Sequence, residues 1–150
     1  MMNDCPAVDF AVGKPGEGIR LLVEASNAAA PSPEWAARFM RNLFLHVDIP
    51  RSEYFLLALR NHLYLWHHPD RESANPDYEG DTAAALRPYL MRLDRTLDRL
   101  SESSFELLIQ AWLGDLVSGT LPDEESLRWL KDSGLAESVR DGFITSNLAA

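Results

Sequence analysis

The chain has 150 residues, 46% of them hydrophobic and 25% charged, which is typical of a single globular domain and excludes wholesale disorder. No apolar run approaches the roughly 20 residues that a membrane-spanning helix needs. The formal net charge of −9 disfavours general binding to nucleic acid or to anionic lipid, because phosphate groups would be repelled.

The N-terminal part of the chain shows no regular apolar period. Residues 1–18 are rich in glycine and proline, so we predict a loose lead-in followed by a single helical domain over residues 19–150. The stretch also lacks the basic start and apolar centre of a secretory signal, which predicts a cytoplasmic protein. A short amphipathic helix is expected over 19–30 and a second over 33–47, with Ser32 as its cap.

The segment 53–68 is predicted to be the central helix of the fold. Almost every side chain in it is apolar, and a helix that is apolar around most of its circumference usually packs against several neighbours. Pro50 and Pro69 mark its two ends as helix breakers. His62 would then point into the core.

Residues 69–80 form the one long internal loop of the predicted fold, and loops of this length are often functional. The next helix, over 81–100, carries a regular stripe of leucines. Further helices are predicted over 103–119, which opens with a capping box, and over 122–134, before a last short turn. The predicted fold class is therefore all-α, a compact single-domain bundle of about six helices.

Three histidines, followed by Asp70 and Glu72, resemble a set of metal ligands, but their spacing argues against one. Two ligands on the same helix are normally three or four residues apart. His62 and His67 are five residues apart and His68 is further along, so we expect His67 and His68 to favour the negative end of the helix. The sequence predicts no metal site and no cofactor.

His62 is the one candidate catalytic residue. A histidine on an apolar face needs a hydrogen-bond partner and can have a shifted pKa. The commoner role of such a residue is structural, as a core histidine that bridges two helices. A functional His62 would instead predict an enzyme, or a metal or cofactor protein, with a site between helices.

Standard catalytic motifs are absent from the sequence. Cys5 has no adjacent base or positive charge that would favour its thiolate, and as the only cysteine it excludes an intramolecular disulfide. The glycine-rich stretch 13–18 lacks the residue order of a phosphate-binding loop. An enzyme is therefore the less favoured interpretation.

Acidic residues are concentrated in the last third of the chain. Residues 101–150 carry three basic against nine acidic side chains, and so hold six of the nine net negative charges. An aromatic residue among acids is typical of a contact site for a basic protein, although a solvated acidic face is the simpler alternative. The candidate partner-binding residues are Asp115, Asp123, Glu124, Glu125, Trp129 and Asp132.

The function that these patterns favour is a small acidic protein-binding module, such as an inhibitor or immunity protein, an adaptor or a chaperone, that binds a basic protein partner. The alternative is a helical-bundle enzyme or a metal or cofactor protein with an inter-helix site around His62. A third hypothesis is self-association, with a homo-oligomer formed through the leucine stripe of Leu86, Leu90, Leu93 and Leu97.

Overall fold

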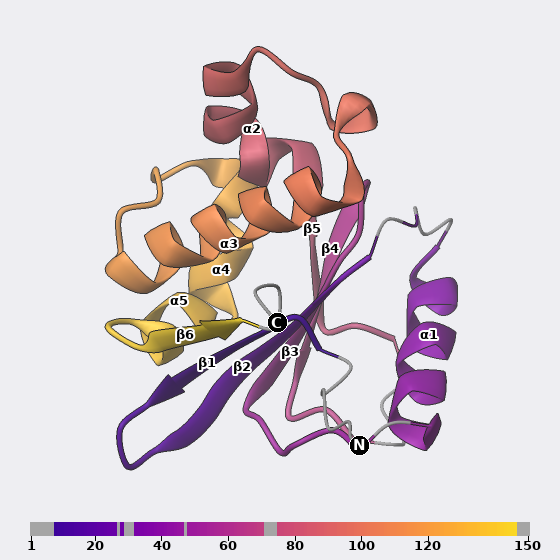
Figure 1. Cartoon of the computed structure of the whole chain (residues 1–150). Coiled ribbons are helices and arrows are strands. Elements are labelled where there is room, and N and C mark those ends of the chain that lie inside the picture. The colour runs from indigo at the N-terminus through magenta and orange to yellow at the C-terminus, as the bar shows by residue number, and fades with distance from the viewer. Residues whose placement is uncertain (1–7, 27, 29–31, 47, 71–74, 147–150) are drawn as a thin grey trace.

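A computed structural model describes residues 8–26, 28, 32–46, 48–70 and 75–146. At its centre is a six-stranded sheet with the strand order β5-β4-β3-β2-β1-β6. Helix α1 covers one face of the sheet, and α2 to α5 lie on the other (Figure 1). The fold is therefore α/β, and the prediction of an all-α helical bundle is wrong.

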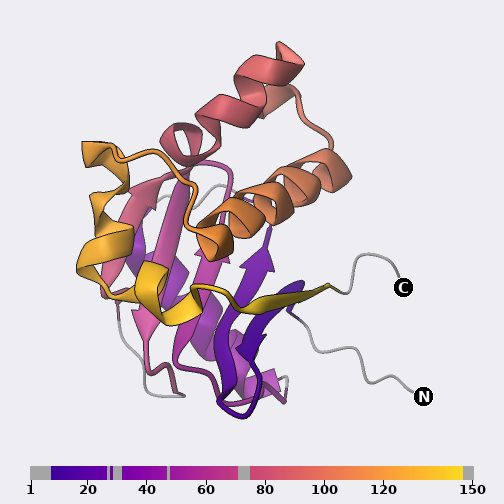
Figure 2. The same ribbon diagram turned by 90° about the vertical axis from the view of Figure 1, so that its left-hand side faces the viewer.

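The strands are β1 (Phe10–Lys14), β2 (Gly18–Ala25), β3 (Tyr54–Ala58), β4 (His62–His67), β5 (Tyr78–Asp81) and β6 (Phe143–Ser146). The helices are α1 (Pro33–His46), α2 (Thr82–Leu93), α3 (Glu102–Ser118), α4 (Arg128–Asp132) and α5 (Leu135–Val139), with single 3-10 turns η1 (Leu97–Arg99) and η2 (Glu125–Leu127). Strands β2 and β3 run parallel and are connected through α1, whereas the other neighbours are antiparallel. Figure 2 shows α2 reaching past one end of the sheet, with α3 beside it and packed against the sheet face.

The segment 53–68, expected to be a central helix, is instead the antiparallel hairpin β3–β4. Its strands are covered on both faces, so the side chains of 54–59 and 63–66 are all apolar and the two-residue alternation of a half-exposed strand is missing. Leu56 packs toward α2 to α5, while Phe55 and Leu57 pack toward α1. A strand buried on both faces and a buried helix both appear in a sequence as a continuous apolar run. The apolar pattern alone therefore predicted a helix where the chain forms strands.

The N-terminal prediction also needs correction. Residues 10–25 form the antiparallel hairpin β1–β2. The sequence had instead predicted a loose lead-in up to residue 18 and a helix after it. Gly16 and Gly18 take φ of 76° and 77° in its turn, a left-handed conformation that glycine adopts at little cost. The described residues of the expected helix 19–30 are therefore not helical, and residues 1–7 lie outside the described part of the chain.

The later helices largely follow the sequence. Helix α1 matches its predicted position, and α3 ends at Gly119 as expected, with a φ of 73° at that residue. The cap of α3 is Ser101, whose hydroxyl oxygen accepts a hydrogen bond of 3.1 Å from the Ser104 N–H, in place of the predicted Ser103. Helix α2 is shorter than predicted, because Asp94 adopts a left-handed conformation and ends it. No helix in the described ranges is long and apolar enough to cross a membrane.

Candidate functional site

Two carboxylic acids lie side by side where β1 begins and β2 ends. The pairing of Phe10 with Val23 brings Asp9, the residue before β1, opposite Glu24 of β2. The Asp9 N–H donates a hydrogen bond of 2.9 Å to the Val23 carbonyl, and Asp9 Oδ2 accepts one of 2.8 Å from the Ala25 N–H. The two acids, called the carboxylate pair below, are thus held on a rigid sheet.

The carboxylate pair binds a proton at neutral pH. Burial raises the pKa of Glu24 to about 8, with further contributions from the negative charges of Asp9 and Glu106 and from a hydrogen bond with Asp9. Burial also raises the pKa of Asp9, and the charge of Glu102 adds to this, against hydrogen bonds from Ala25 and Glu24 that lower it. Two neighbouring carboxyl groups that cannot both ionise freely share one proton, here centred on Glu24.

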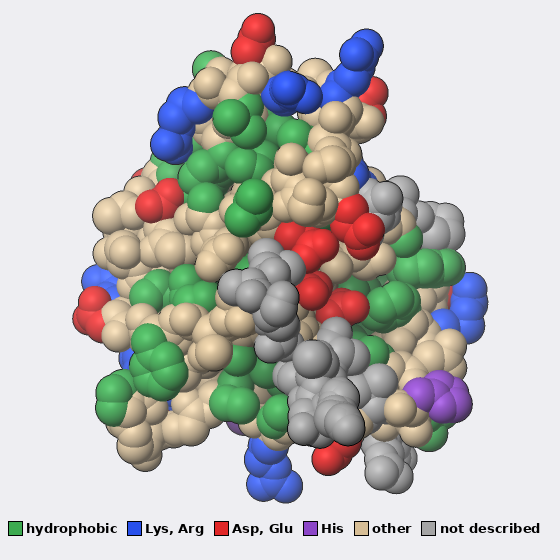
Figure 3. All heavy atoms as spheres, in the orientation of Figure 1, with side chains coloured by type: hydrophobic (Ala, Val, Ile, Leu, Met, Phe, Trp, Pro, Cys, Tyr) green, Lys and Arg blue, Asp and Glu red, His purple; other side chains and the backbone are tan. Residues whose placement is uncertain are grey.

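Helix α3 adds two further acids near the carboxylate pair. Glu102 and Glu106 lie in its first turns, at the end that Ser101 caps. Burial is the largest cause that raises the pKa of Glu106, and the negative charges of Asp9 and Glu102 raise it further. No basic side chain is among the causes of the shifts at Asp9, Glu24 and Glu106. Acidic side chains gather near the middle of the face shown in Figure 3.

One oxygen of the pair has no partner within the described residues. Glu24 Oε1 is buried and makes no hydrogen bond there. A buried polar atom without a partner carries a desolvation cost, so such atoms are uncommon and often mark a site for a ligand or a proton. The described residues contain no group of three or more His, Cys, Asp or Glu side chains that could enclose a metal ion. The site is therefore built on two carboxyl groups, and a bound ion would take its other ligands from solvent.

Neither Asp9 nor Glu24 is among the site residues predicted from the sequence. The available signal was that each acid stands between two apolar residues inside an apolar stretch. The assignment of Asp9 to a loose lead-in and of Glu24 to a helix removed the reason to compare them, since only the β1–β2 register brings them together.

The structure places the histidines apart from this site. His62 begins β4, where it is partly buried and its ring lies 5.6 Å from that of Tyr64. His67 stacks between Tyr54 at 4.5 Å and His68 at 4.1 Å. The expectation that His67 and His68 stabilise a helix end is wrong, because His67 is the last residue of strand β4 and His68 follows it. Cys5 and Glu72 lie outside the described residues.

The candidate partner-binding residues do not form one surface of free acids. Asp115 accepts hydrogen bonds from the hydroxyls of Tyr89 and Thr120, which link it to α2 and to the end of α3. Trp129 is partly buried against the core and lies over Gly80 of β5. Glu125 is exposed in η2.

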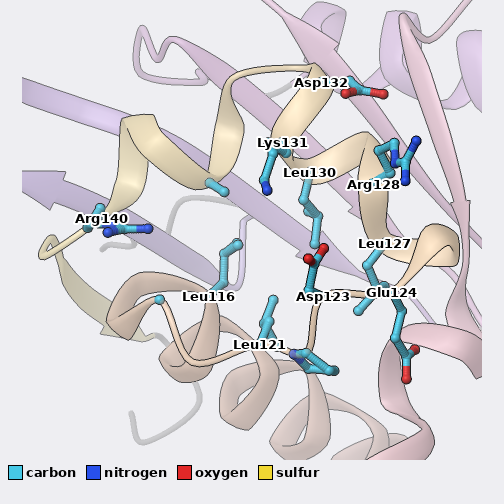
Figure 4. Close-up of a pocket in the computed structure, with 13 residues that line it drawn as sticks. Leu116, Leu121, Asp123, Glu124, Leu127, Arg128, Leu130, Lys131, Asp132 and Arg140 are labelled. Carbon is cyan, nitrogen blue, oxygen red and sulfur yellow. The ribbon is translucent and has the colours of Figure 1, made fainter.

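The remaining acids of that group, Asp123, Glu124 and Asp132, line a pocket of about 510 Å³ beside the end of α3 (Figure 4). The same pocket is lined by the three basic residues of the last third of the chain, Arg128, Lys131 and Arg140. The excess of acid in the sequence of this third therefore becomes a mixture of both signs around the pocket.

The leucine stripe is divided between the interior and the surface. Leu86 is fully buried and Leu90 is 9% exposed, and both belong to the core beneath α2 and α3. Leu97 is partly buried against the same core, whereas Leu93 is 51% exposed. Self-association through the whole stripe stays a prediction, and in the folded chain Leu93 is the member most open to a second copy.

Comparisons with protein-family models, with curated proteins and with solved structures give no significant match.

Proposed function

We propose that the protein binds one hydrated divalent cation, of the Mg²⁺ or Mn²⁺ class, at the carboxylate pair of Asp9 and Glu24. The observation that carries the proposal is that the β1–β2 register places these two partly buried carboxyl groups side by side, with Glu24 Oε1 buried and without a partner among the described residues. No basic side chain is among the causes of their raised pKa values. The proposal departs from the sequence analysis, which predicted no metal site.

A small divalent cation fits this arrangement for two reasons. It supplies a positive charge next to acidic side chains that have no basic side chain to compensate them, and carboxylate oxygens are its preferred protein ligands. Mg²⁺ in particular keeps several water molecules and is often held by only one or two carboxylates, so two protein ligands suffice. The coordination positions left to water are also open to another oxygen ligand, as in catalytic metal sites.

Cation and proton compete for the same oxygen atoms. Because Glu24 is protonated at pH 7, binding of a cation must displace its proton. The decisive experiment is calorimetric titration with MnCl₂ at pH 7 in two buffers of different ionisation enthalpy, which together give the number of protons released. We expect saturable binding and release of about one proton per cation, declining above roughly pH 9, where Glu24 is already ionised.

The variants Asp9→Asn and Glu24→Gln should each weaken Mn²⁺ binding by about tenfold or more, since each removes one of two anionic ligands. The matched control is Glu34→Gln, at an exposed position in the first turn of α1, which should bind like the wild type. Absence of saturable binding in the folded wild-type protein, or equal binding by Glu24→Gln, would show that the proposal is wrong.

The protein-binding role expected from the sequence stays a prediction. Its residues Asp123, Glu124 and Asp132 share their pocket with three basic side chains, so a purely basic partner would meet repulsion there as well as attraction.

A further inference from the structure

The pocket of about 510 Å³ beside the end of α3 shares no residue with the carboxylate pair. Its floor is apolar: Leu116, Leu127 and Leu130 are at most 6% exposed, and Leu121 and Ala136 are partly buried beside them. Its walls come from the loop that follows α3, from η2, and from α4 and α5. The volume lies within the usual range for sites that take small organic molecules.

Charges of opposite sign line this pocket without neutralising one another. Lys131 and Arg140 make no ion pair or side-chain hydrogen bond with any described residue, and the same holds for Asp123. Figure 4 shows Lys131 on α4 and Arg140 after α5 reaching toward the space that Asp123 borders. No two of these three groups come within ion-pair distance of each other, so each leaves a charge that a ligand can meet, whereas Glu124 in the same lining pairs with Arg87 at 4.0 Å.

We infer that this pocket binds a small zwitterion with an apolar body, of the class of an apolar α-amino acid. The carboxylate of the ligand would lie at Lys131 and Arg140, its ammonium group at Asp123, and its side chain on the leucine floor. A simple carboxylic acid would leave Asp123 facing its negative charge, and a simple amine would leave two cations without a partner. A ligand that carries both charges meets all three groups.

The test uses three probes that share a benzene ring: L-phenylalanine, 3-phenylpropanoate, which lacks the ammonium group, and 2-phenylethylamine, which lacks the carboxylate. Binding is measured by ligand-observed NMR or by calorimetry on the full chain. We expect L-phenylalanine to bind about tenfold more tightly than either fragment, since each charged hydrogen bond contributes a factor of about ten or more.

Two variants distinguish the contribution of the basic side chains to binding from that of Asp123. Arg140→Gln should weaken L-phenylalanine and 3-phenylpropanoate by about tenfold and leave 2-phenylethylamine unchanged, whereas Asp123→Asn should affect the amine-bearing probes alone. The matched controls are Arg38→Gln and Asp48→Asn, both at exposed positions outside the pocket. Circular dichroism checks that every variant is folded, and all four residues are exposed, so their replacement should not disturb the core.

The inference is overturned if L-phenylalanine does not bind at concentrations up to about 10 mM, well above the Kd expected for two ion pairs and a buried ring. It is equally overturned if the three probes bind alike, or if Arg140→Gln binds all of them like the wild type.

Discussion

The hydroxyl of Tyr54 donates a hydrogen bond of 2.6 Å to the backbone carbonyl of Ser133, and so joins the central strand β3 to the turn between α4 and α5. Both residues are buried. Helices α4 and α5 have only five residues each, too few to be stable alone, and they depend on such attachments to the sheet. We predict that Tyr54→Phe lowers the free energy of unfolding by about 1–3 kcal/mol, because it leaves a buried carbonyl without a partner.

Urea unfolding followed by circular dichroism measures this loss. Tyr78→Phe on β5 is the matched control, since the Tyr78 hydroxyl makes no hydrogen bond with the described residues. If Tyr54→Phe destabilises the protein no more than this control, the hydrogen bond contributes nothing to stability.

The stability of the protein should fall as the pH rises from about 5 to 9. Glu24 has a pKa of about 8 in the folded chain against 4.5 for an ordinary glutamate, so the unfolded chain loses this proton at a lower pH. The stabilisation is complete below about pH 4.5 and is lost as the pH rises through 8. We predict that Glu24→Gln, which cannot ionise, flattens the dependence of Tm on pH.

Thermal unfolding at several pH values checks this prediction, with Glu34→Gln as the control that should keep the wild-type slope. Addition of Mn²⁺ at pH 8 to 9 should raise the Tm of the wild type and not that of Glu24→Gln, because a bound ion stabilises the folded state. Parallel wild-type and Glu24→Gln curves would mean that Glu24 titrates normally.

Gly80 has no room for a side chain. A Cβ atom there would lie 2.3 Å from Trp129 Nε1, closer than any non-bonded contact allows. We therefore predict that Gly80→Ala displaces the Trp129 ring, shifts the tryptophan fluorescence and destabilises the fold by about 1–3 kcal/mol. The control is Gly114→Ala within α3, where nothing lies within 4 Å of the added atom and alanine should stabilise the helix by up to about 1 kcal/mol. Equal effects of both substitutions would contradict the packing of Trp129 on β5.

His62→Ala tests the role that the sequence offered for this histidine. Because His62 begins a strand and contacts Tyr64, we predict a stability loss of no more than about 1 kcal/mol and unchanged Mn²⁺ binding. Loss of Mn²⁺ binding in a folded His62→Ala protein would show that His62 contributes to the functional site.

How far the sequence predicts this fold depends on what covers each element. Helix α1 follows from Ser32 and the amphipathic period, and α3 from its apolar stripe and Gly119, because their outer faces meet solvent and keep the period visible. The hairpin β3–β4 is apolar on both faces, so its residues carry no period that separates a strand from a helix. Its available signals were Arg60 and Asn61 at the turn and the aromatic residues on either side.

The candidate site was out of reach for a related reason. Asp9 and Glu24 are 15 residues apart in the sequence, and they become neighbours only through the β1–β2 register. The sequence shows which charged residues the last third of the chain contains, but it cannot show that Lys131, Arg140 and Asp123 line the same pocket. Both sites are formed by residues from segments that are distant in the sequence. Local sequence patterns predict the secondary structure of each segment but not which segments come into contact.

The position of β6 beside β1 affects how the protein folds during synthesis. Phe10 lies opposite Ser146, so this pairing joins an early strand to the last described element. While the ribosome makes the residues between them, the outer edge of β1 has no intramolecular partner, and an open edge can pair with another chain. Strand β6 can cover this edge of β1 only after residues 143–146 have been made, and a nascent chain stalled before residue 143 would expose an edge on which aggregation can begin.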